Sequence, residues 1–381
     1  MTRTALTLFL AFAVPFALHA DTPRPRDVSA DLRPIVVQRG VPGLIAGIVD
    51  KDGLVALGAA GVRRLGSPSM ISKNDLIHLG SCTKAMTATV IAMLVEDGTL
   101  SWDQTVGQSF PELGVSMHEQ WRGVTIAKLL QHRGGAPADL RFDGLWDRLC
   151  ASNDPPPKQR MELVRAVVAR NPEAPPGSKF IYSNAGYAIA GTVAEHAAAR
   201  GYEELMQQRL FKPLEMTSAG FGAPGTADRN DQPRGHTEKG KTIEPGRGAD
   251  NPPAIAPAGT VHCSMKDWSK FLRLHLNAAM GEPRLLKDES FERLQTPAGS
   301  GKMPYAMGWA CFERAWADGA VLTHNGTNTM WFCAVWMAPS KGFAVMAACN
   351  QGGKTAEKAV DEAAWTLVQQ HLKLPRDTKP K

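Results

Sequence analysis

The chain has 381 residues and a formal net charge of +6, with 43 Lys and Arg against 37 Asp and Glu. This length allows one large core or two lobes. The basic residues are scattered rather than clustered, which indicates a solvated surface and no nucleic-acid partner.

The first 20 residues have the layout of a secretory signal peptide. Arg3 precedes an apolar run from Ala5 to Leu18, and the small Ala20 is followed by polar residues. This run is too short for a transmembrane span, and no later stretch reaches that length. We therefore expect a signal peptide over 1–20, a linker over 21–34, a domain over 35–374 and a tail over 375–381, with export to the periplasm.

Strand patterns occur near both ends of the domain. Residues Pro42 to Arg64 contain two apolar runs joined at Asp52-Gly53, which predicts a hairpin. Residues Thr329 to Asn350 repeat this scheme, and their unbroken apolar runs predict central strands covered on both faces. A helical pattern over Thr355 to Leu374 can cover one face.

Helical patterns fill most of the chain between the two hairpins, beginning with a long apolar helix at Ser81. We therefore predict an α+β (α/β sandwich) fold. Its antiparallel sheet comes from both chain ends and is flanked by helices, and a mainly helical lobe is inserted over roughly 98–260. Residues 222–257 are rich in Pro, Gly and charge without periodicity, and we expect them to wall a cleft.

The only S-x-x-K motif of the chain is Ser81-Cys82-Thr83-Lys84. One interpretation is a helix cap followed by a lysine in solvent. The other is a nucleophile with its base, since residues three apart share a helix face and burial lowers the pKa of a lysine. The motif alone does not separate these two.

Two later motifs carry groups that suit acyl transfer. Tyr182-Ser183-Asn184 precedes a helix, where Asn184 is either an N-cap or an amide that bonds the lysine and a substrate, and Tyr182 is either a core aromatic or a proton relay. The segment from His324 to Thr327 is either a glycine turn or an edge strand. An oxyanion needs two N–H donors, and the Ser81 and Thr327 amides are our candidates.

Three motifs in this order resemble the serine β-lactamase-related family, which includes class C β-lactamases, D-Ala-D-Ala carboxypeptidases and family VIII esterases. The resemblance extends over "LVEDGTLSWDQTV", "IAKLLQHRGGAP", "PAGTVHCSMKDWSKFL" and "YAMGW". It implies a β-lactamase/transpeptidase-like fold with the site between sheet and helical lobe.

The resemblance also implies the roles of the motif residues. Ser81 would be the nucleophile of an acyl-enzyme, Lys84 would take its proton, and Tyr182 would act as general base or acid. Asn184, His324, Gly326 and Thr327 would bind the substrate or its oxyanion. No metal or organic cofactor is needed, and the six cysteines include no C-x-x-C pair that would suggest a zinc site.

The chain departs from β-lactamases in the third motif, where His324 and Asn325 stand in place of a lysine and a threonine. A neutral or half-charged histidine is a weaker anchor for a substrate carboxylate, and Arg133 is a candidate replacement. This favours an esterase or peptidase that takes a small ester, peptide or β-lactam-like substrate. The alternatives are a D-Ala-D-Ala carboxypeptidase or β-lactamase, and a non-catalytic ligand or cell-wall binding protein; the oligomeric state stays open.

Overall fold

The computed structural model describes residues 24–277, 284–299, 303–375 and 378. The expected signal peptide over 1–20 lies outside these residues. No helix in the described ranges is both long and apolar enough to cross a membrane.

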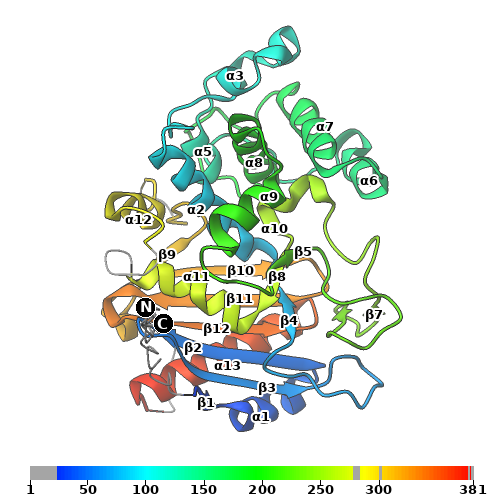
Figure 1. Cartoon of the computed structure of the whole chain (residues 1–381), viewed down its shortest axis with the longest axis vertical. Coiled ribbons are helices and arrows are strands. Elements are labelled where there is room, and N and C mark those ends of the chain that lie inside the picture. The colour runs from blue at the N-terminus through cyan, green and yellow to red at the C-terminus, as the bar shows by residue number, and fades with distance from the viewer. Residues whose placement is uncertain (1–23, 278–283, 300–302, 376–377, 379–381) are drawn as a thin grey trace, which may run out of the picture.

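In the described part of the chain, the main sheet has seven strands in the order β1-β3-β2-β12-β11-β10-β9 (Figure 1). Every neighbouring pair is antiparallel except β1 with β3. The strands are β1 (Arg26–Asp27), β2 (Gly43–Asp50), β3 (Leu54–Gly61), β9 (Ala310–Arg314), β10 (Gly319–Thr327), β11 (Phe332–Ala338) and β12 (Phe343–Cys349). The pairing of β2 with β12 joins the two chain ends, as the sequence predicted.

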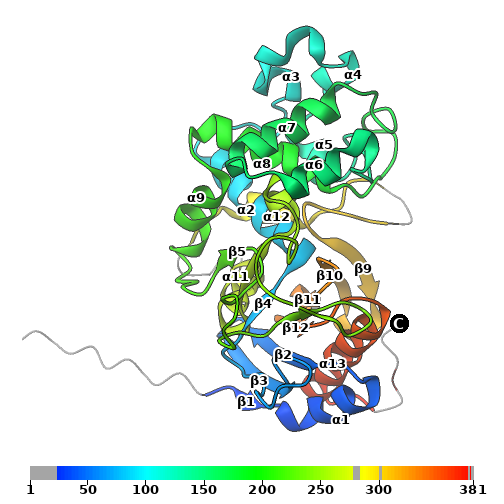
Figure 2. The ribbon, with the colours of Figure 1, turned by 90° about the vertical axis from the view of Figure 1, so that its right-hand side faces the viewer.

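Helices cover both faces of this sheet (Figure 2). On one face lie α1 (Ser29–Arg39) and α13 (Lys354–Leu372), and on the other lies α11 (Met265–Asn277). The central strands β2 and β12 are buried along almost their whole length because each packs between these two layers. The predicted α+β sandwich is confirmed.

The start of the domain differs from the prediction. Helix α1 begins at Ser29, inside the segment expected to be a linker, and it buries Leu32 and Ile35 against the sheet. Only these two positions of the helix are buried, and Pro34 lies within it, so the sequence shows little helical periodicity there. Residues 29–34 therefore belong to the folded domain.

The helical lobe stands at one end of the sheet (Figures 1 and 2). Between lobe and sheet runs α2 (Thr83–Glu96), which is buried on nearly all sides, and α12 (Asp288–Gln295) packs beside it. The lobe helices are α3 (Val106–Ser109), α4 (Glu119–Arg122), α5 (Ile126–Leu130), α6 (Leu145–Ala151), α7 (Pro156–Val168), α8 (Asn184–Ala198), α9 (Tyr202–Met206) and α10 (Ala256–Gly259).

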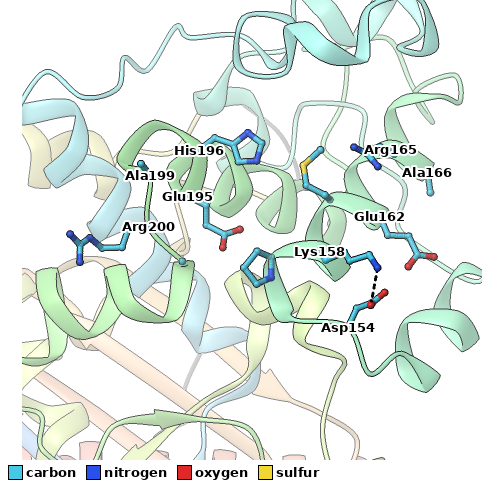
Figure 3. Close-up of a pocket in the computed structure, with 12 residues that line it drawn as sticks. Asp154, Lys158, Glu162, Arg165, Ala166, Glu195, His196, Ala199 and Arg200 are labelled. Carbon is cyan, nitrogen blue, oxygen red and sulfur yellow. Dashed lines mark hydrogen bonds and ion pairs between the residues drawn. The ribbon is translucent and has the colours of Figure 1, made fainter.

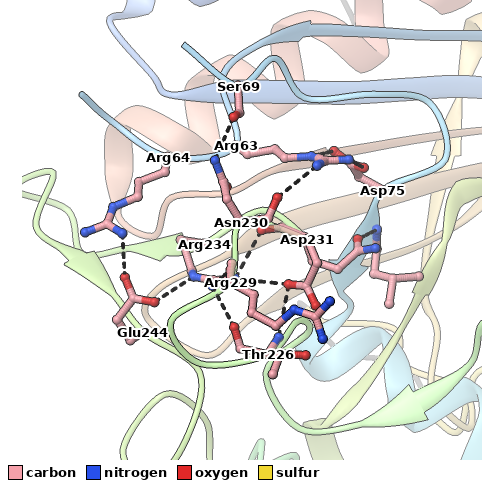
Figure 4. A network of polar contacts seen from close by, with 12 residues as sticks. Arg63, Arg64, Ser69, Asp75, Thr226, Arg229, Asn230, Asp231, Arg234 and Glu244 are labelled. Atoms are coloured by element: carbon pink, nitrogen blue, oxygen red, sulfur yellow. Dashed lines mark hydrogen bonds and ion pairs between the residues drawn. The ribbon is translucent and has the colours of Figure 1, made fainter. Parts of the chain in front are cut away.

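Residues 222–257 are tied to the sheet end by charged side chains. They contain a short hairpin of β6 (Gly235–His236) and β7 (Thr242–Ile243). Arg234, directly before β6, contacts Glu244, directly after β7, at 2.8 Å. Arg63, which pairs with Asp75 at 2.6 Å, also donates to the Asn230 carbonyl (Figure 4). Buried and bidentate arginine contacts of this kind hold an aperiodic segment in one conformation.

A second, smaller sheet leads into the S-x-x-K motif. Its strands are β4 (Leu76–His78), β8 (Val261–Ser264) and β5 (Gly220–Phe221), with β8 in the middle. Strand β4 ends directly before the turn that carries Ser81, so this sheet sets where α2 starts.

Candidate active site

Ser81 lies in a single 3-10 turn, Gly80–Cys82, that joins β4 to α2. Gly80 has φ +46, and a Cβ there would lie 2.3 Å from the Thr327 amide nitrogen. Only glycine allows both this backbone conformation and this close approach. The turn that carries Ser81 therefore packs closely against the end of β10 at Thr327.

Lys84 is the most deeply buried group of the site. Its side chain is 0% exposed, and Nζ lies 3.1 Å from Ser81 Oγ, 2.8 Å from Asn184 Oδ1 and 2.8 Å from the Ala258 carbonyl oxygen. Burial disfavours the ammonium form and lowers the pKa of Lys84 to about 7. The interpretation of Lys84 as a solvated surface lysine is therefore wrong.

Tyr182 and Asn184 reach the same point from the lobe. Ser183, not Asn184, caps α8, because its Oγ accepts from the Gly186 amide at 3.2 Å. This leaves the Asn184 amide oxygen to accept from Lys84. Tyr182 is 37% exposed, and Lys84 Nζ lies 4.8 Å from its ring centroid. Desolvation raises the pKa of the Tyr182 hydroxyl, and a hydrogen bond with Ser81 opposes this shift.

Strand β10 presents a free edge beside Ser81. It pairs with β11 from Leu322 to Thr327, but β9 pairs with it only from Gly319 to Thr323. Gly326 is in close contact with the β4 end, since a Cβ there would lie 1.9 Å from the Leu79 carbonyl oxygen. The structure thus brings together all three motifs that the sequence singled out.

His324 borders the site, but the protein itself uses both of its ring nitrogens. Nδ1 lies 2.7 Å from the Asn325 carbonyl oxygen and Nε2 lies 3.0 Å from Tyr305 Oη. A carbonyl only accepts, so Nδ1 carries the proton and Nε2 accepts from the tyrosine. Burial and the nearby charge of Lys84 lower the pKa of His324 to about 3. The imidazole is therefore neutral, which leaves no cation where β-lactamases have a lysine.

Arg133 does not take over this charge. Its guanidinium donates to the Gly177 carbonyl at 2.9 Å, and Arg133 does not line the cavity that Tyr182 and His324 share. The replacement anion contact considered from the sequence thus has no support in this geometry.

Two aromatic residues at the site have no role in the sequence-based prediction. His132 Nδ1 accepts from the Ser183 amide at 3.1 Å, and its ring lies 4.4 Å from that of Tyr182 and 4.7 Å from that of Tyr305. His132 thereby fixes the backbone between Tyr182 and Asn184. The two residues, His132 and Tyr305, lie in segments that carry the family resemblance. The residue pattern of neither segment indicates that the two rings are in contact.

Asp250 connects the segment that precedes Ser81 with the segment that follows β10, through contacts with His78 and Asn328. Its Oδ1 lies 2.8 Å from Nε2 of the fully buried His78 and accepts from Asn328 Nδ2 at 2.9 Å. His78 Nδ1 in turn accepts from the Gly80 amide at 3.1 Å. Residues 222–257 line no part of the cavity at Tyr182, contrary to our expectation, and act on the site through Asp250 instead.

We expect Asp250→Ala to lower the free energy of unfolding by about 2 to 4 kcal/mol, because buried groups of His78 and Asn328 lose a charged partner. We also expect kcat to fall about tenfold with little change in KM, since displacing the Ser81 and Thr327 amides, our candidate oxyanion donors, would weaken only the transition state. Denaturant unfolding and steady-state kinetics measure both. Asp250→Asn should recover part of each loss, whereas Asp139→Ala, at a side chain 66% exposed, should change neither. An unchanged kcat in Asp250→Ala would contradict this role.

Two large cavities differ in their relation to these residues. One, of about 920 Å³, is lined in part by Tyr182, His324 and Asn325. The other, of about 930 Å³, lies between α7 and α8, where Lys158 pairs with Asp154 (Figure 3). None of the motif residues lines the second cavity. The first cavity therefore adjoins the site at Tyr182 and His324, although Ser81 itself is not part of its lining.

No group of three or more His, Cys, Asp or Glu side chains in the described ranges is placed to hold a metal ion. The polar groups around Ser81 are a buried amine, an amide, a phenol and backbone N–H groups. This is the composition of an acyl-transfer site that works by nucleophilic attack and proton transfer.

Comparisons with known proteins agree with this arrangement. The family model described as Beta-lactamase matches residues 28–370. Penicillin-binding protein 4 of Amycolatopsis lactamdurans is 28% identical over 83% of this chain and 82% of its own length. Unguisins hydrolase ungD' of Aspergillus campestris is 26% identical over 81% of this chain, which spans 58% of that relative.

Among solved structures, the D-alanine carboxypeptidase AmpC of Burkholderia cenocepacia has a TM-score of 0.69 with 22% identity. The match covers 87% of this chain and 96% of that one, so the two share a fold. Because the family model spans nearly the whole described chain and includes all three motifs, this protein belongs to the Beta-lactamase family of serine hydrolases.

Proposed function

We propose that the protein is a secreted serine hydrolase that forms an acyl-enzyme on Ser81 and cleaves an ester or peptide. The observation that carries this proposal is the buried amine of Lys84, 3.1 Å from Ser81 Oγ, with a pKa of about 7. A serine hydroxyl is a weak nucleophile unless an adjacent base accepts its proton. Lys84 is such a base at neutral pH.

The three contacts of Lys84 suit its neutral form. A neutral amine has two N–H donors and one lone pair. The donors are satisfied by Asn184 Oδ1 and the Ala258 carbonyl, which leaves the lone pair to accept from the Ser81 hydroxyl. As Ser81 Oγ attacks the substrate carbonyl carbon, its proton moves to Lys84 Nζ. The Ser81 and Thr327 amides stabilise the resulting oxyanion.

Tyr182 completes the reaction from the other side of Ser81. Because its pKa is raised, its hydroxyl stays protonated and donates to the leaving alcohol or amine as the carbonyl bond to that group breaks. The protonated Lys84, which holds the proton taken from Ser81, then returns it to the Tyr182 oxygen, since the acylated Ser81 Oγ carries no proton. Water repeats the attack on the acyl-enzyme, which releases the acid and restores Ser81.

The surroundings of His324 support esters or peptides over β-lactams. Penicillins carry a carboxylate, and the neutral His324 offers it no charge. A peptidase remains the second candidate because one relative is a penicillin-binding protein and a structural neighbour is a D-alanine carboxypeptidase. The proposed export rests on the sequence of residues 1–20 alone.

Covalent labelling tests this proposal. We expect a fluorophosphonate to add to Ser81, as located by mass spectrometry of the digested protein, and a labelled penicillin to add at least tenfold more slowly. Ser81→Ala should take up neither reagent. Label from both at similar rates would favour the β-lactamase or carboxypeptidase alternative. No adduct from either reagent would leave the non-catalytic binding protein as the better account.

A further inference from the structure

The sheet face under α13 is only partly covered. Helix α13 packs mainly on β2, β11 and β12, while β9 and β10 continue beyond it. The cavity of about 920 Å³ follows this remaining strip of the sheet. Its volume lies within the range of small-molecule sites, roughly 300 to 1,000 Å³.

The strand register gives this strip an apolar floor. Phe312 on β9 is paired with Val321 on β10, while Thr323 is paired with Ala310 on one side and Trp336 on the other. Side chains of directly paired residues point to the same face of a sheet, so these five form one continuous surface. All five line the cavity.

Three tryptophans close the end of the cavity that is farther from Ser81. The ring of Trp316 lies 6.5 Å from that of Trp336 and 6.2 Å from that of Trp365, which α13 contributes. The charged residues of the lining include both signs, and one pair, Arg39 with Glu362, is matched at 2.7 Å. The lining therefore combines an apolar floor with charged side chains of both signs, among them Arg314, whose guanidinium lies 5.3 Å from the Phe312 ring.

The other end of the cavity borders the proposed catalytic site, although Ser81 and Lys84 do not line it. Tyr182, His324 and Asn325 line it together with Phe312 and the tryptophans. Asn325 belongs to the part of β10 that β9 leaves unpaired. The Ser81 turn lies against Thr327 on the same strand, so a chain that runs from a carbonyl at Ser81 along the edge of β10 would pass Asn325 before it reaches the apolar floor.

We propose that this cavity, which we call the β9–β10 groove, binds a long apolar chain of the substrate, an alkyl or acyl group of six or more carbons. This inference rests on the proposed function, because the chain must belong to the substrate whose carbonyl Ser81 attacks, on its acyl or its alcohol side. The apolar floor that Phe312, Val321 and Trp336 form along the groove supports it. Phe312, Thr323 and Trp336 determine the preferred chain length.

Two series of esters test the groove. One series is p-nitrophenyl acetate, butyrate and octanoate, and the other is ethyl, butyl and octyl acetate. Each buried methylene raises kcat/KM about three- to fourfold. We therefore expect octanoate over butyrate, or octyl over butyl, to gain at least tenfold. If kcat/KM does not rise with chain length in either series, the proposal is overturned.

Variants of residues in the groove test whether the rise of kcat/KM with chain length comes from this cavity. Phe312→Ala removes part of the floor and Thr323→Trp fills the groove, so both should reduce the chain-length gain at least threefold. Phe142→Ala is the matched control. The Phe142 ring also lies under an arginine, 4.6 Å from Arg170, as the Phe312 ring lies 5.3 Å from Arg314. Phe142, however, is in the helical lobe. Equal gains in Phe312→Ala, Thr323→Trp and the control would contradict the assignment.

A binding measurement separates this inference from the proposed function. In Ser81→Ala, which cannot form an acyl-enzyme, octanoate binding is followed by calorimetry, and we expect Phe312→Ala to weaken it at least threefold. If Ser81 takes up no fluorophosphonate, the proposed function fails while this result still decides the groove. The groove could instead be an interface between two copies of the chain. In that case Phe312→Ala would abolish a dimer detected by light scattering and would leave octanoate binding unchanged. That result would overturn the proposal.

Discussion

Replacing Lys84 with methionine is expected to lower the rate of fluorophosphonate addition to Ser81 by about 10² to 10⁴-fold. Methionine fills a similar volume but accepts no proton from the Ser81 hydroxyl. Lys84 also bonds Asn184 and the Ala258 carbonyl, so its loss leaves these acceptors unpaired as well. The rate is measured by quenching the labelling reaction at set times and determining the labelled fraction by mass spectrometry. Circular dichroism verifies that the variant is folded.

The pH dependence distinguishes a base from a merely structural lysine. The pKa of Lys84 is lowered to about 7, so the proton-accepting neutral form is absent well below pH 7 and predominates above it. We expect kcat/KM to rise tenfold per pH unit below about pH 7 and to level off above it. His324 adds no step in this range because its pKa is about 3. Lys158→Met, at an exposed ion pair, should keep the full profile. An unchanged profile in Lys84→Met would transfer the base role to Tyr182.

Replacing Gly326 with alanine is expected to lower kcat about 10² to 10³-fold and the free energy of unfolding by about 1 to 3 kcal/mol. The added Cβ would lie 1.9 Å from the Leu79 carbonyl oxygen and 2.8 Å from Cys333 Sγ, so β10 must move away from β4. That movement separates the Thr327 amide from the Ser81 amide. Steady-state kinetics and thermal unfolding measure the two effects.

Gly123→Ala is the control for this substitution. An added Cβ at Gly123 meets no atom within 4 Å, and its φ of −96 is accessible to alanine. We expect it to leave kcat and stability within experimental error of the parent protein. If Gly326→Ala behaved in the same way, the contact between β10 and the Ser81 turn would not be needed for catalysis.

Local patterns were sufficient to predict the main elements. The unbroken apolar runs between Thr329 and Asn350 correspond to β11 and β12, and the buried S-x-x-K helix corresponds to α2. These predictions succeeded because each depends on residues close together in the chain. Helix α1 was missed since only one side of a short, proline-containing segment is buried.

The finer features of the site depend on contacts between distant residues. Lys84 meets Asn184 and Ala258, which lie 100 and 174 positions away, and this enclosure lowers its pKa. The tautomer of His324 depends on the Asn325 carbonyl and on Tyr305, and Asp250 is held by His78 and Asn328. No periodicity within a window of the sequence contains this information.

The strand order has a consequence for how activity arises during synthesis. Strand β12 lies between β2, from the start of the domain, and β11, from its end, so the two halves of the sheet cannot pair until Cys349 has left the ribosome. Ser81 and Lys84 are made much earlier, but β10 can be held beside them only once β12 has closed the sheet. Non-local pairing of this kind forms slowly. An incomplete chain therefore carries the serine and the lysine before the Thr327 amide, the second proposed oxyanion donor, is held beside them.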